Sequence, residues 1–189
     1  MINGSIATRY SRALFEEAQA QLIDKDVYEY MNTLYDNMQT VPHLQAAIHN
    51  PRVAKEKKFR LLVTSSGINA DTVSQTKGDK HTLYTRFLQL VLEHQREIHL
   101  RTMILVYREL FREYHQIDHI IFETATKADE ALLQKVEAKV HALTGRGVEL
   151  EAVVRPELIG GCCLRVADLL YDYSYRTRLQ NIRKQLWNK

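Results

Sequence analysis

The sequence has few of the features that build a covalent or membrane-spanning framework. Its only two cysteines, Cys162 and Cys163, are neighbours. Neighbouring cysteines cannot link distant parts of a chain, so a disulfide scaffold is excluded and a reducing compartment fits best. No apolar run approaches the roughly 20 residues that cross a bilayer, and the longest, at 87–92 and 103–106, are short. A function at a membrane would therefore depend on other proteins.

The first residues predict no targeting leader. The stretch 1–6 lacks the charged and then apolar character of a signal peptide. It also lacks the Arg- and Ser-rich character of an organellar transit peptide. This absence favours a bacterial protein over an organellar one.

Motifs of common enzyme classes are also missing. Gly160 and Gly161 are followed by cysteine, where a phosphate-binding Walker loop needs lysine and then serine or threonine. The chain has no nucleophile elbow and no HExxH zinc motif. We therefore predict no catalytic residue, no metal site and no cofactor. We expect the two glycines to permit close packing or an unusual backbone bend.

The composition describes an ordinary globular chain. It has 189 residues, of which 45% are hydrophobic and 26% charged. These values allow packed cores and, by length, two small domains. The formal net charge of +3 is too mild to indicate nucleic-acid binding by itself.

Helical periodicity dominates residues 1–115. Apolar residues recur at three- and four-residue spacing in six segments, which predicts six helices. The third should begin near Pro42, since proline suits the first turn of a helix. The sixth, at 100–114, is apolar over so wide an arc that it should be buried on several sides. The pattern predicts an N-terminal six-helix bundle.

The periodicity changes at residues 116–189. β-Branched and aromatic residues at 120–124, and further strand patterns at 148–154 and 162–173, predict a short sheet. A helix between the first two strands should be stopped by Gly145 and Gly147. The predicted fold is therefore α+β, in which a small C-terminal α/β module with two helices follows the bundle.

The second helix of this module has two faces. Ser174 is positioned to N-cap it. We expect its apolar stripe to face inward: Tyr175, Leu179, Ile182 and Leu186. Other positions are basic: Arg176, Arg178, Arg183, Lys184 and Lys189. The charge has three interpretations: a solvated face, a docking surface for an acidic partner, or a nucleic-acid contact. The last defines the alternative function, a small basic nucleic-acid-associated helical protein, although no aromatic stacking platform accompanies the charge.

Two stretches resemble one known family. Residues 6–15, IATRYSRALF, are similar to the opening motif RYA-x-ALF of ATP synthase delta subunits and their mitochondrial counterpart, the oligomycin-sensitivity-conferring protein. Residues 148–179 resemble the family's C-terminal signature, a strand, LIGG, a strand with Arg, a turn with Asp, and D-x-S opening the last helix. The matching structural positions are Gly160, Gly161, Arg165, Asp168, Asp172 and Ser174.

The chain also departs from the family pattern. Ala167 stands where the family usually has glycine, and Cys162-Cys163 replace a small apolar pair. At the end of the fifth helix the family commonly has ENGR. The corresponding residues 93–96 here read EHQR, which predicts a less abrupt helix stop. None of these changes touches a catalytic group, since the family has none on this subunit.

The resemblance implies a non-catalytic stator subunit of an F-type ATP synthase. The N-terminal bundle would bind alpha subunits of the catalytic head. The C-terminal module would bind the b-type subunit of the peripheral stalk, so that proton flow stays coupled to ATP synthesis. The resemblance also implies a peripheral membrane protein on the cytoplasmic face of a bacterial inner membrane, with no nucleic-acid partner.

By the same resemblance, the first and fifth helices form a groove for the N-terminal helix of an alpha subunit. Tyr10 and Leu90 fall on the matching positions. Their plausible neighbours are Ala13, Leu14, Phe87 and Val91. A helix bound in an apolar groove is a common recognition mode. The same residues could equally form bundle core alone, so both interpretations stay open at this point.

Overall fold

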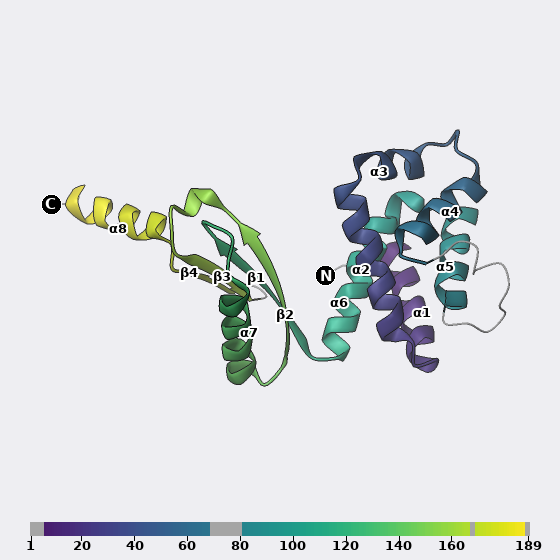
Figure 1. Ribbon diagram of the computed structural model, residues 1–189. Coiled ribbons are helices and arrows are strands. Elements are labelled where there is room, and N and C mark those ends of the chain that lie inside the picture. The colour runs from purple at the N-terminus through teal and green to yellow at the C-terminus, as the bar shows by residue number, and fades with distance from the viewer. Residues whose placement is uncertain (1–5, 69–80, 167–168, 188–189) are drawn as a thin grey trace. The chain divides into compact units, whose positions relative to one another are not determined.

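The computed structural model describes residues 6–68, 81–166 and 169–187. It divides into two compact units, Met1–Phe111 and Arg112–Lys189, whose elements are labelled in Figure 1. Helices make up the first unit and a sheet with helices the second, so the fold is α+β. The division falls in the last turn of the sixth helix.

Six α-helices precede the first strand in the described part of the chain. Their bounds are α1 Ile6–Ala20, α2 Asp24–Thr40, α3 Pro42–His49, α4 Lys55–Ser65, α5 His81–Glu93 and α6 Leu100–Tyr114, with a short 3-10 helix, η1 Glu97–His99, before α6. α3 begins at Pro42, as the sequence predicts, because proline at the first helical position loses no hydrogen bond. α1 packs against α2 and α5, and α4 packs against α2, α3 and α5.

Hydrogen bonds join α6 to two other helices of the first unit. Ser11 on α1 donates a bond of 2.7 Å to the Met103 carbonyl, and Tyr107 donates one of 3.2 Å to the Asp24 carbonyl. The buried residues of α6 are Leu100, Met103, Ile104, Val106, Tyr107 and Phe111. The wide apolar arc in the sequence is therefore covered on several sides, as predicted.

The second unit contains a four-stranded sheet in the order β2-β1-β3-β4. The strands are β1 Ile117–Thr124, β2 Gly147–Val154, β3 Cys162–Val166 and β4 Leu169–Asp172. β1 and β2 are parallel and are joined through helix α7, Glu130–Thr144, which packs against β2. The other two pairs are antiparallel. α7 ends at Gly145 in the left-handed conformation, φ 68°, which confirms the predicted stop.

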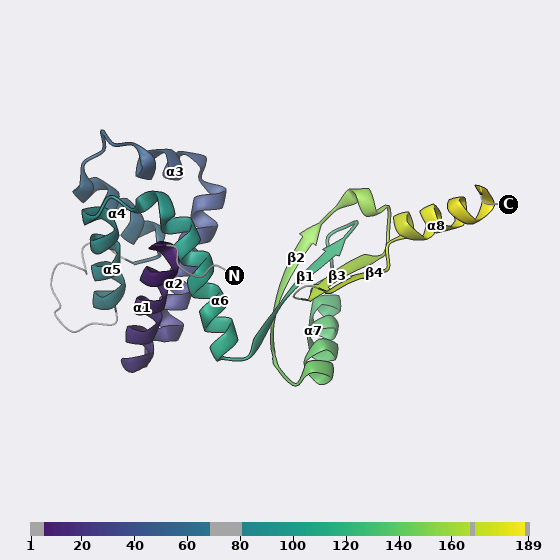
Figure 2. The same cartoon turned by 180° about the vertical axis from the view of Figure 1, so that it is seen from behind.

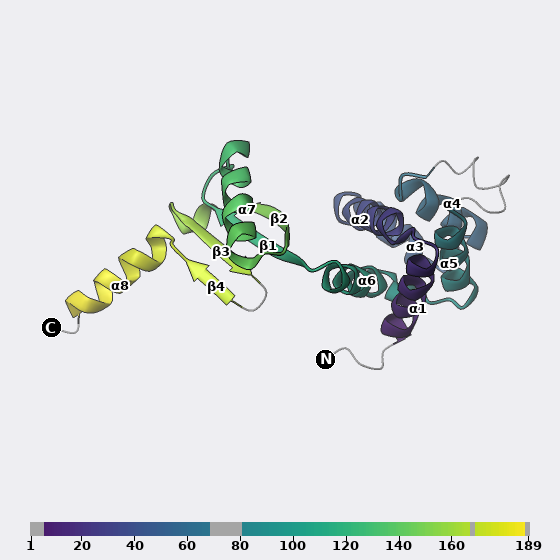
Figure 3. The same ribbon diagram turned by 90° about the horizontal axis from the view of Figure 1, so that it is seen from below.

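The last helix, α8 Tyr175–Trp187, corrects one prediction. The sequence predicts that its apolar stripe faces inward, yet α8 has no buried residue. The stripe residues are 48% to 74% exposed: Tyr175, Leu179, Ile182 and Leu186. α8 contacts the short helix η2, Pro156–Leu158, and Figure 3 shows it extending beyond the sheet. Periodicity identifies the apolar face of a helix but not the surface that covers it.

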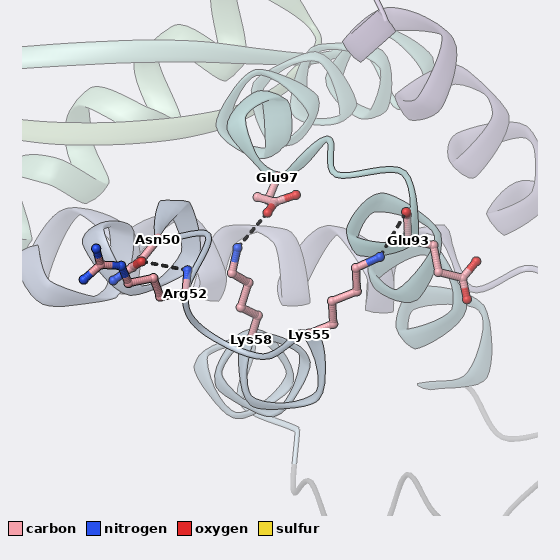
Figure 4. Close-up of polar contacts among 6 residues, drawn as sticks. All are labelled: Asn50, Arg52, Lys55, Lys58, Glu93 and Glu97. Carbon is pink, nitrogen blue, oxygen red and sulfur yellow. Dashed lines mark hydrogen bonds and ion pairs between the residues drawn. The ribbon is translucent and has the colours of Figure 1, made fainter.

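Two lysines on α4 contact the end of α5 and the segment that follows it (Figure 4). Lys58 Nζ lies 2.7 Å from Glu97 Oε1 in η1. Lys55 Nζ donates a 3.3 Å hydrogen bond to the carbonyl of Glu93, the last residue of α5. Burial opposes ionisation of Glu97, but its hydrogen bond and ion pair with Lys58 outweigh burial and hold the pKa of Glu97 below its ordinary value.

Lys58→Met is expected to lower the free energy of unfolding of the first unit by about 3 kcal/mol, because Glu97 would lose its counter-ion in a mostly buried place. Lys57→Met, at an exposed neighbouring position, is the matched control and should change it by less than about 0.5 kcal/mol. Urea unfolding followed by far-UV circular dichroism measures both. An equal fall in the free energy of unfolding of the two variants would contradict a stabilising role for the Lys58–Glu97 ion pair.

The same pair predicts a pH dependence with a defined sign. Folding lowers the pKa of Glu97, so the stabilisation is complete above the unfolded-state value of about 4.3. It is lost as the pH falls through the lower folded-state pKa. The stability difference between Lys58→Met and Lys57→Met should therefore shrink in acid.

Candidate partner-binding surfaces

α1 and α5 lie side by side in the first unit (Figure 2). Three of the six predicted groove residues are core, at 7% exposure or less: Leu14, Phe87 and Val91. The other three reach the surface: Tyr10 is half-buried, and Ala13 and Leu90 are exposed. We call these last three residues the α1/α5 face. Burial therefore assigns Leu14, Phe87 and Val91 to the core, and the groove interpretation stays a prediction for the three residues at the surface.

Arg96 orients the Tyr10 side chain. Its Nη1 donates a hydrogen bond of 2.6 Å to the Tyr10 hydroxyl, and its guanidinium carbon lies 5.1 Å from the centroid of the Tyr10 ring. An arginine above an aromatic face is attracted by the ring's quadrupole. The two residues are 86 positions apart in the chain, so no local sequence signal identifies Arg96 as the partner of Tyr10.

The end of α5 places Arg96 in this position. The Arg96 amide donates to the Val91 carbonyl at 2.9 Å, and the Gln95 amide donates to the Leu92 carbonyl at 3.2 Å. These two bonds, with Gln95 at φ 54°, form a Schellman C-cap. The prediction of a less abrupt helix stop is therefore wrong. Gln95 adopts the left-handed conformation that glycine usually supplies, at a cost of about 1–2 kcal/mol.

The two glycines of the C-terminal signature allow a close approach between chain segments. Gly161 has φ 78°, and a Cβ there would lie 2.3 Å from the Tyr173 carbonyl oxygen. A Cβ on Gly160 would lie 2.6 Å from the Tyr175 ring. The Tyr175 amide also donates to the Gly160 carbonyl at 2.9 Å. Their role is close packing with an unusual bend, which holds the start of α8 against the segment before β3.

Asp172 and Ser174 fix the beginning of α8. Ser174 Oγ accepts a 3.3 Å bond from the Thr177 amide, which is the predicted N-cap. Asp172 accepts hydrogen bonds from the Ser174 amide, the Thr177 hydroxyl and the Cys163 thiol. These bonds hold the pKa of Asp172 well below its usual range. Burial, aided by the bond to Asp172, raises the pKa of the Cys163 thiol to about 11, so the thiol stays protonated near neutral pH.

Of the two further signature positions, the structure describes one. Arg165 on β3 has an exposed side chain and pairs in register with Leu170. Asp168 lies outside the described residues, as does Ala167. Four of the described signature residues therefore build the junction between β4 and α8: Gly160, Gly161, Asp172 and Ser174.

The second unit buries little apolar surface. Its buried apolar side chains, among the residues described, are Ile120, Phe122, Val140, Leu158 and Cys163. The edge strand β4 exposes three large side chains, by 45% to 61%: Leu169, Leu170 and Tyr171. The α8 stripe, which we define as Tyr175, Leu179, Ile182 and Leu186, is also exposed. So much apolar surface on one small unit is typical of an interaction site.

Metal-binding clusters and membrane-spanning helices are both absent from the described part of the chain. Its His, Cys, Asp and Glu side chains form no cluster of three that could hold a metal ion. None of its helices is long and apolar enough to cross a bilayer. The candidate sites are therefore the α1/α5 face and the apolar surface of the second unit.

Comparison with known proteins places the chain in a family. The family model described as ATP synthase delta (OSCP) subunit matches residues 6–186. The ATP synthase subunit delta of Parabacteroides distasonis is 36% identical over 183 residues, 97% of this chain and 96% of the relative. That of Symbiobacterium thermophilum is 31% identical over 186 residues, 98% of this chain and 95% of the relative.

A solved structure has the same fold. A chain in the cryo-EM structure of the Toxoplasma gondii mitochondrial ATP synthase hexamer superposes with a TM-score of 0.70 at 20% identity, over 97% of this chain and 98% of that one. The family match spans both units, from α1 into α8. The chain therefore belongs to the ATP synthase delta (OSCP) subunit family.

Proposed function

We propose that this chain is a non-catalytic stator connector of an F-type ATP synthase. Its first unit, acting as one six-helix bundle, binds the catalytic head through the N-terminal helix of an alpha subunit. Its second unit binds the b-type subunit of the peripheral stalk. The connection keeps the head from turning with the rotor, so that proton flow drives ATP synthesis.

The exposed apolar surface of the second unit carries the proposal. β4 and the α8 stripe leave seven large apolar side chains outside any core of the described chain: Leu169, Leu170, Tyr171, Tyr175, Leu179, Ile182 and Leu186. Each such side chain gains about 1.5–3 kcal/mol when it is fully buried. Several of them buried together support the slow dissociation that a repeatedly loaded stator joint needs, even after the ordering costs of association.

Head binding is supported by the α1/α5 face. Tyr10 and Leu90 offer an aromatic and an aliphatic anchor on two adjacent helices, and the small, exposed Ala13 lies three positions after Tyr10 on α1. An amphipathic helix binds such a surface through anchors at three- and four-residue spacing. The Arg96 contact holds the Tyr10 ring in one orientation, which lowers the ordering cost of binding.

The location follows from the complex rather than from the chain. Its relatives named above are delta subunits of bacterial ATP synthases. We place the chain at the cytoplasmic face of a bacterial inner membrane, held there by its partners. Loss of the chain should leave ATP hydrolysis by the head uncoupled from proton movement.

Affinity purification of the full chain in mild detergent tests the proposal. Alpha and b-type subunits are both expected to copurify with it. Recovery of neither subunit from cells that assemble the complex would refute the proposal, as would substrate turnover by the purified chain alone.

Tyr10→Asp is expected to weaken binding of an alpha N-terminal peptide by roughly tenfold to hundredfold, because it removes an apolar anchor and places a charge on the α1/α5 face. Isothermal titration of the peptide onto wild type and variant measures the change. Tyr114→Asp, the same substitution at a residue 62% exposed on α6, is the matched control and should bind normally. Equal affinity of all three proteins would refute the head-binding site.

A further inference from the structure

α8 carries a coiled-coil pattern that the described chain leaves largely uncovered. The α8 stripe residues are separated by four, three and four positions, the spacing of alternating d and a positions in a heptad repeat. Three of them, Leu179, Ile182 and Leu186, line a shallow open depression with Arg183 and Trp187. A lone helix of 13 residues with no buried side chain is marginally stable in water. The pattern and the exposure together indicate a helical partner.

The positions flanking the α8 stripe are basic on both sides. With Leu179 at a and Ile182 at d, Arg176 and Arg183 occupy e positions and Arg178 occupies a g position. α8 contains no acidic residue. The e and g positions contact the partner helix and choose it by charge. The sequence around the stripe therefore selects a partner with acidic flanks.

This charge pattern disfavours a second copy of the chain as the occupant. Pairing α8 with itself would place arginines of one helix against arginines of the other, in either orientation, and like charges destabilise such a contact. The shape of the α8 stripe also disfavours a lipid surface. A strict a and d seam is narrow, whereas a helix that lies on a membrane presents a wide apolar face.

We infer that the α8 stripe pairs with an acidic amphipathic helix of the stalk subunit in a two-stranded, coiled-coil-like contact. The inference rests on the proposed function, which supplies the stalk as the partner of this unit. It adds that α8 is the contacting element, that the contact is coiled-coil-like, and that the partner helix is acidic. Residues Leu179 and Ile182 form the centre of the seam, and the three arginines pair with carboxylates that flank the partner's apolar residues.

Two designed peptides test the chemistry of the partner with the full chain. Each has three heptads with Leu at a and d; one has Glu at e and g, and the other has Lys there. Trp187, the only tryptophan of the chain, is 79% exposed on α8, and its fluorescence reports binding. The Glu peptide should bind at least about tenfold more tightly than the Lys peptide. Equal binding of both peptides would overturn the inference.

Substitutions on α8 test the geometry. Leu179→Asp should weaken binding of the Glu peptide by about tenfold or more, because it places a charge in the seam. Asn181→Asp adds the same charge on the opposite side of α8 and should change affinity by less than about twofold. Arg178→Glu combined with Arg183→Glu should reverse the preference toward the Lys peptide. A preference that stays with the Glu peptide would refute the arginine pairing.

The stalk subunit itself separates this inference from the proposed function. If wild type binds the b-type stalk and Leu179→Asp binds it equally well, the α8 contact is wrong and stalk binding stands. If wild type fails to bind the stalk at all, the proposed function fails, whatever the peptides do. If the wild type sediments as a dimer and Leu179→Asp as a monomer, the occupant of the α8 stripe is a second copy of the chain. If the fluorescence of Trp187 changes with anionic vesicles but not with the Glu peptide, the occupant of the α8 stripe is a membrane. Either result overturns the inference.

Discussion

A protein ending at His115 is expected to bind the isolated catalytic head as the full chain does, within about twofold, and to lose measurable binding of the b-type stalk. The truncation keeps every buried apolar residue of the first unit, of which Phe111 is the last. It removes the whole sheet and α8, which hold the apolar surface assigned to the stalk. The two binding activities should therefore separate completely.

Co-sedimentation with each partner in turn measures the separation. The reciprocal fragment, starting at Arg112, serves as the control and should bind the stalk alone. It keeps the ion pair between Arg112 Nε and Glu149 Oε2, at 2.6 Å, which belongs to the second unit. A truncated protein that still held the stalk would defeat this division of labour.

Gly161→Ala is expected to lower the free energy of unfolding of the second unit by about 4 kcal/mol. Two costs add at this position. A side chain at φ 78° costs about 1–2 kcal/mol. Its Cβ would also lie 2.3 Å from the Tyr173 carbonyl oxygen, a backbone atom, and forcing the two segments apart costs a further 1–3 kcal/mol or so. The unit has a small core, so a loss of this size should abolish stalk binding as well.

Gly145→Ala measures the conformational cost without the steric one. Gly145 has a similar φ of 68°, but a Cβ there would meet nothing within 4 Å. The free energy of unfolding of Gly145→Ala should therefore fall by about 1–2 kcal/mol, the conformational cost alone. Thermal unfolding of the reciprocal fragment carrying each substitution measures both. Similar losses at the two glycines would show that the approach to Tyr173 costs nothing.

The order of elements in both units was predictable because it depends on local patterns. Pro42 begins α3 and Gly145 ends α7, since the backbone preferences of proline and glycine act within one turn. Ser174 caps α8 for the same reason. The end of α5 was not predictable, because Gln95 adopts a conformation that its residue type disfavours and that the surrounding hydrogen bonds impose.

The candidate site was predictable only in part. The apolar periodicity of α1 and α5 includes Tyr10 and Leu90 along with Leu14 and Val91, and the family resemblance predicts a groove there. Neither separates exposed side chains from core. Arg96 was not predictable as the partner of Tyr10. Its position relative to α1 depends on the turn after α5, which Lys58 and Lys55 hold from α4.

The sequence by itself determined the family, the type and order of the elements, the apolar face of α8 and the basic charge beside it. These properties reside in residue identity and spacing, which a chain carries whether or not it is folded. Only the tertiary structure decided which apolar residues of α1 and α5 are core, which arginine meets Tyr10, and that the α8 stripe stays exposed. These depend on contacts between segments far apart in the chain, and local periodicity contains no information about which distant surface, if any, will cover a given face.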